Sequence, residues 1–356
     1  MINILLAAGL SLLFTLFTTP LLIKYLTRKK YGQFIREDGP DSHQVKRGTP
    51  TMGGLVIVAA VLFAYAVSHL LLWNPPTLSA ILVLALMLAM GFLGFLDDSS
   101  KIAKERSLGL TPRGKLIGQF IIGGLFGWAV LNFPNARGLT PGSNAVSFLR
   151  DISWLVLPTI VAIIFVAFLV SAWSNATNLT DGLDGLLAGS ATLVFAAYTL
   201  ISIWQFNQWC GRLSSSGPRC YLVRDPYDLA VVAISLAAAC FGFLWWNAKP
   251  AKIFMGDTGS MAIGASLAGL SVMTRTELLA VLIGALFVME AGSVFLQVAY
   301  FKATKGKRIF KMSPIHHHFE LKGWQEVTVV IRFWIICGLF VALGIGLFYA
   351  EWVVGQ

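Results

Sequence analysis

Residues 78–98 read LSAILVLALMLAMGFLGFLDD, and this stretch decides the class of fold. Residues 78–96 carry no charge. A bilayer core about 30 Å thick is crossed by an α-helix of about 20 apolar residues, so the stretch predicts a transmembrane helix. Two adjacent carboxylates, Asp97 and Asp98, stand at its end. We therefore expect a membrane protein with a polar site at the edge of the bilayer.

The composition of the whole chain supports a helical membrane protein. Hydrophobic residues make up 56% of the 356 residues and charged residues only 12%, whereas soluble domains carry about 25% charged residues. This excludes a soluble enzyme, a disordered chain and a disulfide scaffold. Ten spans would use roughly 200 residues, which leaves only short loops. We predict an all-α polytopic integral membrane protein with a single transmembrane catalytic domain over residues 1–356.

Apolar segments of the right length recur ten times along the chain. The first has no cleavage site after it and is interpreted as an anchoring span, not as a cleaved signal peptide. The predicted spans lie roughly at 2–23, 53–73, 78–96, 115–133, 154–174, 185–205, 228–246, 258–273, 278–301 and 328–350.

The basic residues predict the orientation of these spans. Loops near 24–52, 97–114, 175–184, 247–257 and 302–327, with their flanks, hold 21 of the 27 Lys and Arg residues. The positive-inside rule places these loops in the cytoplasm and both termini on the external side. The net charge of +10 is explained by this distribution, so nucleic acid is not an expected partner. The remaining basic residues fall outside: Arg137, Arg150, Arg212, Arg219, Arg224 and Arg275.

Each cytoplasmic loop carries a dense polar cluster at a membrane boundary. Asp97 and Asp98 should be partly desolvated and repel each other, which suits a proton acceptor or a metal-associated pair; a solvated helix end is the alternative. Residues 175–185, NATNLTDGLDG, supply two amides and two carboxylates among glycines. They predict a polar ligand site or, alternatively, a loop of Asx turns.

Three more clusters each allow a functional interpretation and a purely structural one. Residues 254–260, FMGDTGS, place Asp257 at a helix start, where N–H donors suit phosphate and a carboxylate suits Mg²⁺; an ordinary N-cap is the alternative. Residues 314–318, PIHHH, favour phosphate contact or proton handling over zinc, whose ligands are usually spaced; a solvated surface turn is the alternative. In residues 46–54, KRGTPTMGG, the basic residues are also explained by topology.

Together the clusters point to one chemistry. Carboxylates for a metal, cations for oxyanions and amides for a base or a sugar all lie on one face of the membrane, next to apolar surface that could hold a lipid. We infer phosphoryl transfer at the cytoplasmic surface between a soluble nucleotide and a lipid.

These same stretches resemble the phospho-N-acetylmuramoyl-pentapeptide transferase family of bacteria. The matching residues run from 46 to 318: KRGTPTMGG, GFLDD at 94–98, residues 175–185, FMGDTGS and PIHHH. The wider superfamily of polyprenyl-phosphate sugar-1-phosphate transferases shares the Asp pair and the Asn/Asp loop. The resemblance implies Mg²⁺-dependent transfer from UDP-N-acetylmuramoyl-pentapeptide to undecaprenyl phosphate, giving lipid I and UMP, in the bacterial inner membrane.

The resemblance also implies roles for residues. Asp257 would bind Mg²⁺, and Asp97, or less favourably Asp98, would deprotonate or position the lipid phosphate. His316 and His317 would contact phosphate or the sugar. The nucleotide pocket would be lined by Lys46, Asn178, Asp181, Asn247, Phe254 and Gln297, with Thr51 and Asp184 near it. Membrane lipids are expected partners, and a homodimer is left open.

Two other functions compete with this one. Another enzyme of the superfamily would use a different UDP-amino-sugar. A secondary transporter would place its polar residues near the bilayer midplane and often show inverted repeats, and the sequence shows neither pattern.

Two structural questions stay open in the sequence. Cys210 and Cys220 share an external loop and could form a disulfide, whereas Cys240 and Cys337 are interpreted as apolar filling inside spans. Glu290 must face the protein or a wet cavity, because a carboxylate in lipid is costly. We expect the ninth span to break near Gly292, beside Ser293, and to open an apolar groove for the lipid; a simple hydrogen bond from Glu290 to a neighbouring helix is the alternative.

Overall fold

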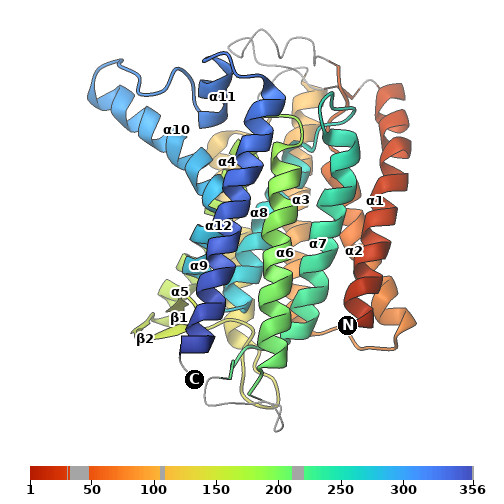
Figure 1. Cartoon of the computed structure of the whole chain (residues 1–356), viewed down its shortest axis with the longest axis vertical. Coiled ribbons are helices and arrows are strands. Elements are labelled where there is room, and N and C mark those ends of the chain that lie inside the picture. Colours follow the sequence, from red (N-terminus) through yellow and green to blue (C-terminus); the bar gives the residue numbers. More distant parts are fainter. Residues whose placement is uncertain (30, 33–47, 105–108, 211–219, 355–356) are drawn as a thin grey trace.

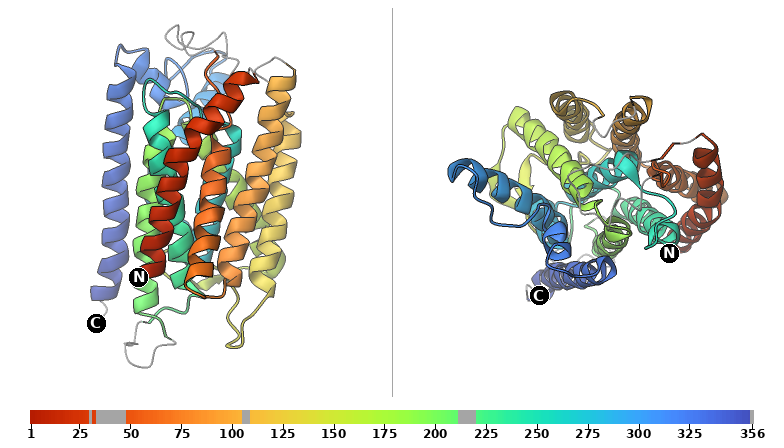
Figure 2. Two further views of the ribbon diagram at one scale, coloured as in Figure 1. Left: turned by 90° about the vertical axis from the view of Figure 1, so that its right-hand side faces the viewer. Right: turned by 90° about the horizontal axis from the view of Figure 1, so that it is seen from above.

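The structure is a computed structural model that describes residues 1–29, 31–32, 48–104, 109–210 and 220–354. Its long helices run alongside one another across the full height of the molecule (Figure 2). The helices are α1 Ile2–Arg28, α2 Gly54–Leu71, α3 Leu78–Ala103, α4 Pro112–Asn132, α5 Thr159–Thr180, α6 Leu186–Asn207, α7 Pro226–Asn247, α8 Gly256–Met273, α9 Glu277–Ile283, α10 Ala285–Ala303, α11 Ile315–Glu320 and α12 Glu326–Val354.

The chain is a multi-pass membrane protein. Within the described residues, nine helices are long and apolar enough to cross a membrane: α1 to α7, α10 and α12. Helices lie at all ten places where spans are expected, with the ninth span divided into α9 and α10. Both termini lie at one end of the bundle, and α3, α5 and α7 end at the other (Figure 1). The number of crossings and their direction stay predictions.

Helix α8 is the centre of the bundle. Every residue from Asp257 to Met273 is buried, and α8 packs against α2, α3 and α5. Its sequence is rich in Gly, Ala and Ser, which lets neighbouring backbones approach closely. A Cβ atom on Gly264 would lie 2.4 Å from the carbonyl oxygen of Trp173 on α5. Because α8 faces protein on all sides, it does not need the strongly apolar composition of a lipid-facing span.

Several polar residues expected in loops belong to helices instead. Helix α3 continues past Asp98 to Ala103, and α5 continues to Thr180, through Asn175 and Asn178. Residues three or four apart on a helix share a face, so these extensions aim the polar side chains in a common direction. The expected start of the fifth span at residue 154 is wrong. Pro158 precedes the first turn of α5, and the preceding segment is a strand.

That strand is part of a small antiparallel hairpin, which an all-α prediction omits. Strand β1 (Ala145–Ser147) pairs with β2 (Asp151–Val156) at the end of the bundle that holds both termini (Figure 1). The hairpin does not alter the helical class of the fold.

The expected break at Gly292 is wrong, and with it the groove that was to open there. Helix α10 is continuous through Gly292, and the Ser293 hydroxyl donates 2.7 Å to the Glu290 carbonyl within the helix. The chain breaks eight residues earlier, at Gly284, where a Cβ atom would lie 2.8 Å from the Trp173 ring. From that point α10 leans away from the bundle (Figure 1). Glu290 itself is fully buried, as expected.

The cysteines follow the interpretation from sequence. Cys240 and Cys337 are buried and free. Cys210 and Cys220 form a disulfide between α6 and α7, which answers the question left open. The C-terminal end of α6 and the N-terminal end of α7, which the disulfide connects, lie at the end of the bundle that holds both termini (Figure 1).

We predict that the α6–α7 loop faces outward. A membrane-impermeant maleimide applied to intact spheroplasts after mild reduction should label Cys210 or Cys220, because the basic residues concentrate at the other end of the bundle. Cys240 and Cys337 are buried and should stay unlabelled, and a variant with both loop cysteines replaced by serine gives the background. Labelling that requires permeabilised membranes would reverse the assigned orientation.

Candidate active site

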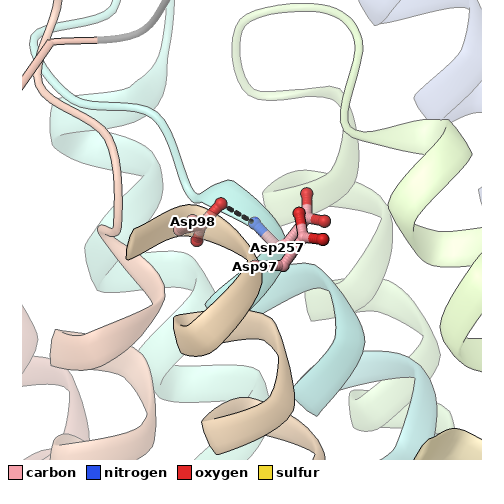
Figure 3. A group of neighbouring side chains, drawn as sticks. All are labelled: Asp97, Asp98 and Asp257. Carbon is pink, nitrogen blue, oxygen red and sulfur yellow. Dashed lines mark hydrogen bonds between the residues drawn. The ribbon is translucent and has the colours of Figure 1, made fainter. Parts of the chain in front are cut away.

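Three buried carboxylates meet where α3 ends and α8 begins. Asp97 and Asp98 come from the last turns of α3, and Asp257 comes from the first turn of α8 (Figure 3). Each is at most 9% exposed, and ligand atoms from the three lie within 4.8 Å of one another. The structure therefore brings together all three residues expected to be catalytic.

Glycines allow this close meeting of helices. A Cβ atom on Gly94 would lie 2.2 Å from the carbonyl oxygen of Asp257, so α8 can begin here only if residue 94 lacks a side chain. Gly54, at the start of α2, is in similarly close contact with α8. A Cβ atom on Gly54 would lie 2.1 Å from the Cα atom of Gly259. Gly256 has φ of +75°, a backbone conformation that glycine adopts without strain.

Asp98 holds the N-terminus of α8. Its Oδ1 accepts from the backbone N–H of Asp257 at 3.1 Å. Its Oδ2 accepts from the backbone N–H of Thr258 at 3.0 Å and from the Thr258 hydroxyl at 2.8 Å. The first N–H groups of a helix have no partner within the helix, and a carboxylate beside them also stabilises the helix dipole. Asp98 thus acts as a cap supplied by another helix.

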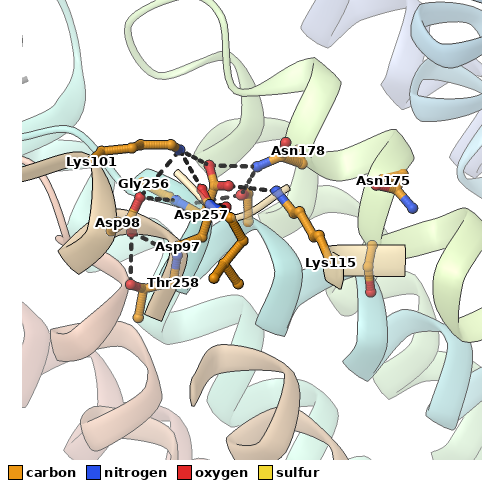
Figure 4. A network of polar contacts seen from close by, with 12 residues as sticks. Asp97, Asp98, Lys101, Lys115, Asn175, Asn178, Gly256, Asp257 and Thr258 are labelled. Carbon is orange, nitrogen blue, oxygen red and sulfur yellow. Dashed lines mark hydrogen bonds and ion pairs between the residues drawn. The ribbon is translucent and has the colours of Figure 1, made fainter. Parts of the chain in front are cut away.

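Two lysines neutralise much of the carboxylate charge (Figure 4). The Nζ atom of Lys101 lies 2.7 Å from Asp97, 3.6 Å from Asp98 and 3.0 Å from Asp257. The Nζ atom of Lys115, on the first turns of α4, lies 2.5 Å from Asp257. Three carboxylates thus face two ammonium groups.

Neither lysine was predicted to be a site residue, because in the sequence both appear as part of the basic charge that sets membrane orientation. One signal was present for Lys101, which stands four residues after Asp97 and would share its face if the helix continued past the carboxylates. No comparable local signal marks Lys115, since its partner is 142 residues away.

Helix α5 contributes an amide to the cluster. The Asn178 side-chain nitrogen donates to Oδ1 of Asp257 and to the Ser260 hydroxyl, each at 2.9 Å. Asn175, one turn earlier, exchanges hydrogen bonds with Gln119 of α4, so it holds helices together and does not face the carboxylates (Figure 4). Of the amides in this segment, Asn178 is the one at the site.

Asp181 follows directly after α5, and the charges of the carboxylate cluster act on its side chain. Burial raises the pKa of its carboxyl well above the usual range, and the charges of Asp257 and Asp98 raise it further. A carboxyl group in this setting favours its protonated form.

The loop before α2 packs against the start of α8. The backbone N–H of Gly53 donates to the Phe254 carbonyl at 2.8 Å, and that of Phe254 donates to the Pro50 carbonyl at 2.8 Å. Thr51 is buried beside Gly256. A Cβ atom on Gly256 would lie 3.0 Å from the Thr51 hydroxyl oxygen. Thr51 and Phe254 therefore border the carboxylate cluster, and Lys46 lies outside the described residues.

Two further residues expected in the nucleotide pocket connect loops to each other. The Asn247 amide accepts from the N–H of Gly185 at 3.1 Å and donates to the Ile253 carbonyl at 2.9 Å. Asp184 accepts from the N–H of Ala251 at 3.1 Å. Both side chains thus fasten the α5–α6 loop to the α7–α8 loop.

The Gln297 side chain makes three hydrogen bonds to the segment that follows α10. Its Oε1 accepts from the N–H groups of Ile309 and Phe310 at 3.1 and 2.9 Å, and its Nε2 donates to the Phe310 carbonyl at 3.2 Å. The structure places Gln297 where it shapes this segment. Its expected contact with a nucleotide stays a prediction.

The histidines lie close to the α5–α6 loop. His316 Nδ1 lies 2.9 Å from Glu290 Oε2, and both residues are fully buried. A Cβ atom on Gly182 would lie 2.3 Å from His316 Nε2, so the ring packs directly against this loop. His317 pairs with Glu320 at 2.7 Å. The Glu290–His316 pair is the neighbouring-helix hydrogen bond that was the alternative to a groove.

The donor set fits a hard divalent cation. Mg²⁺ prefers oxygen ligands and is usually held by one or two carboxylates together with water and substrate phosphates. Asp98 has both oxygens committed to α8, which leaves Asp97 and Asp257 as the available carboxylates. The same two residues contact the lysines, whose ammonium groups suit phosphate oxygens.

The fold and this site define a polytopic membrane glycosyl transferase: residues 80–275 match the family model for glycosyl transferase family 4. Residues 46–58 also match the phospho-N-acetylmuramoyl-pentapeptide-transferase signature 1. The chain belongs to the phospho-N-acetylmuramoyl-pentapeptide-transferase family, which confirms the resemblance carried by its motifs.

Relatives of that name match over nearly the full length. The chain is 63% identical to the one from Cutibacterium acnes over 99% of each chain. It is 59% identical to the one from an Arthrobacter species, over 99% of this chain and all of the relative. It is 55% identical to the one from Beutenbergia cavernae over the whole of both.

Replacing Gly94 with alanine should separate α3 from the start of α8. Overpacking costs about 1–3 kcal/mol, and the displaced Asp257 should lower turnover at least tenfold. Thermal unfolding and initial rates of the purified variant measure both effects. Gly124→Ala is the matched control, because a Cβ atom on that helical glycine meets nothing within 4 Å. Equal stability and turnover in the two variants would contradict the close contact.

The two adjacent carboxylates should differ in their effect on stability. Asp98→Asn loses acceptors at the start of α8, and hydrogen bonds to a charged group contribute about 1.5–3 kcal/mol. In Asp97→Asn the new amide oxygen can still accept from the N–H of Leu110, the backbone partner of Asp97 at 2.9 Å. We expect Asp98→Asn to unfold at a clearly lower temperature than Asp97→Asn. Equal unfolding temperatures would remove the capping role from Asp98.

Proposed function

We propose that the chain transfers phospho-N-acetylmuramoyl-pentapeptide from its UDP derivative to undecaprenyl phosphate, releasing UMP and forming lipid I. The family and the names of its relatives support this reaction. The single observation that carries it is the meeting of three buried carboxylates with two lysines at the end of an apolar bundle. Such a site suits a charged nucleotide on one side and a lipid on the other.

In this reaction an oxygen of the lipid phosphate attacks the phosphorus that carries the sugar. The bond from that phosphorus to the UMP oxygen breaks, and UMP leaves. One pyrophosphate linkage replaces another, so alignment and charge neutralisation account for most of the catalysis. Lys101 and Lys115 would stabilise phosphate oxygens.

Asp97 is the better acceptor or positioning group for the lipid phosphate. Asp98 has both its oxygens occupied at the start of α8, whereas Asp97 Oδ2 lies 2.7 Å from the ammonium group at the end of the Lys101 side chain. A lysine side chain can move to a phosphate, whereas helix N–H groups cannot. Asp98 would then act through Asp257, as a positioning residue.

Asp257, with Asp97, would hold Mg²⁺. The cation would neutralise phosphate charge and orient the reacting groups. Asn178, which donates to Asp257, would keep that carboxylate in position. We expect the reaction to require Mg²⁺.

The nucleotide would lie beside the carboxylates, towards Asn178, Asp181, Thr51 and Phe254. Lys46 is assigned to this pocket by its motif alone. His316 and His317 would contact phosphate or sugar from the side of α11. Asp184, Asn247 and Gln297 would act by shaping the loops that form the pocket, since their amides and carboxylates bind backbone groups there.

The proposal places the protein in the bacterial inner membrane with this site on the cytoplasmic face. The asymmetry of basic residues supports that direction. A transporter is disfavoured, because the carboxylates lie at helix ends and not at the midplane. A homodimer stays a prediction, which the mass of the purified protein in nanodiscs tests.

The decisive experiment is an assay of the purified protein with UDP-N-acetylmuramoyl-pentapeptide and undecaprenyl phosphate. We expect UMP and lipid I in Mg²⁺ and none in EDTA. Asp257→Asn should lower turnover by at least about 10³-fold, because it removes a direct metal ligand. Asp151→Asn, at the far end of the bundle, is the matched control.

Two results would overturn the assignment. Near-normal turnover of folded Asp257→Asn at saturating Mg²⁺ would remove the metal role. Preferential use of UDP-N-acetylglucosamine in direct competition would favour another enzyme of the superfamily.

A further inference from the structure

Glu326 is a buried carboxylate outside the residues assigned to the reaction. It is the first residue of α12, which begins at the end of the bundle opposite both termini (Figure 1). Its side chain is only 3% exposed. The helix dipole favours a carboxylate at this position, but a buried charge also has to be paired and hydrogen-bonded. The partners of Glu326 therefore indicate what this residue does.

The two oxygens of Glu326 contact two different loops. Its Oε1 accepts from the backbone N–H of Asp184 at 3.0 Å, in the α5–α6 loop (residues 181–185). Its Oε2 accepts from Nζ of Lys249 at 2.6 Å, in the α7–α8 loop (residues 248–255). The start of α12 thus connects two loops that are more than sixty residues apart in the sequence.

The two loops also bind each other. The Asp184 carboxylate accepts from the N–H of Ala251 at 3.1 Å, and the Asn247 side chain accepts from the N–H of Gly185 at 3.1 Å. Asp184 is therefore held through its backbone by Glu326 and through its side chain by the α7–α8 loop. Because Glu326 connects α12 to both loops, the three segments fix one another.

These loops carry residues from the two sides of the proposed nucleotide pocket. Asp181 is the first residue of the α5–α6 loop, and Phe254 lies near the end of the α7–α8 loop. Movement of one loop relative to the other would change the shape of that pocket. The carboxylate cluster would keep its geometry, because α3, α4 and α8 hold it through contacts that involve neither loop.

We propose that Glu326 is a positioning residue for the nucleotide, which it serves by holding the α5–α6 and α7–α8 loops in register. It acts through Asp184 and Lys249, towards which its two oxygens point. The inference rests on the proposed function for the kind of ligand, a uridine nucleotide. Loss of Glu326 should weaken nucleotide binding and leave the lipid substrate and the chemical step nearly unaffected.

The binding test uses the full-length protein in nanodiscs, with UDP as the probe and calorimetry in Mg²⁺ as the measurement. Glu326→Met removes both contacts at similar volume and should raise the Kd of UDP by about tenfold or more. Glu326→Gln keeps an oxygen for the Asp184 N–H and loses the ion pair, so its effect should be smaller, about threefold.

Lys249→Met tests the same ion pair from its other side. Lys249 is 38% exposed, so the variant should fold even if Glu326→Met does not. It should raise the Kd of UDP about as much as Glu326→Gln does. Combining Glu326→Gln with Lys249→Met should add little to either change, because residues that act as a pair are not additive.

Steady-state kinetics separate positioning from a general loss of structure. In Glu326→Met the KM for the UDP substrate should rise by about the same factor as the Kd, whereas kcat and the KM for undecaprenyl phosphate should stay within about twofold. Glu351→Met is the matched control. It removes an ion pair with Arg150, 3.0 Å long, from the other end of α12, and it should leave the Kd of UDP unchanged.

Several results would overturn the inference. One is an unchanged Kd of UDP in folded Glu326→Met or in Lys249→Met. Another is a lower kcat with an unchanged KM, which would indicate a purely structural role. Fully additive effects of the two single changes would mean that the residues do not act as a pair. UDP binding needs no turnover, so a parent protein that binds UDP and forms no lipid I would contradict the proposed reaction alone.

Discussion

The contact between the end of α3 and the beginning of α8 is the constraint on which the site depends. Gly94 lets the two backbones touch, and Asp98 then supplies the acceptors that the first N–H groups of α8 need. An apolar helix that starts inside protein has no water to satisfy those groups. The cap from α3 therefore provides hydrogen-bond acceptors for these buried N–H groups, and it also brings Asp257 close to Asp97.

Charge balance is the second requirement of this arrangement. Three carboxylates close together and nearly buried would repel one another strongly. Lys101 and Lys115 offset most of that repulsion. Burial, together with the charges of Asp257 and Asp98, raises the pKa of the neighbouring Asp181 carboxyl. In the proposed reaction, a cation and phosphate groups would take the place of these ion pairs.

Some polar residues at the ends of the spans contact the carboxylate cluster, and others hold helices and loops together. Asn178 contacts the carboxylate cluster, whereas Asn175, Asn247 and Gln297 bind other helices or loop backbones. Sequence motifs present both kinds of residue together, because both are polar groups at the ends of spans. Only their hydrogen-bond partners distinguish them.

The sequence by itself determined the membrane class and the approximate position of the long helices, because span length and charge placement follow from the bilayer. It also marked the Asp pair and Asp257 as candidate site residues, and the structure brings these three carboxylates together. Only the tertiary structure decided that Lys115 reaches Asp257, that Asp98 caps α8 and that the chain breaks at Gly284 and not at Gly292. These features depend on which helices become neighbours. Trp173 packs against Gly284, and nothing packs against Gly292, so two glycines that look alike in a hydrophobic segment have different consequences.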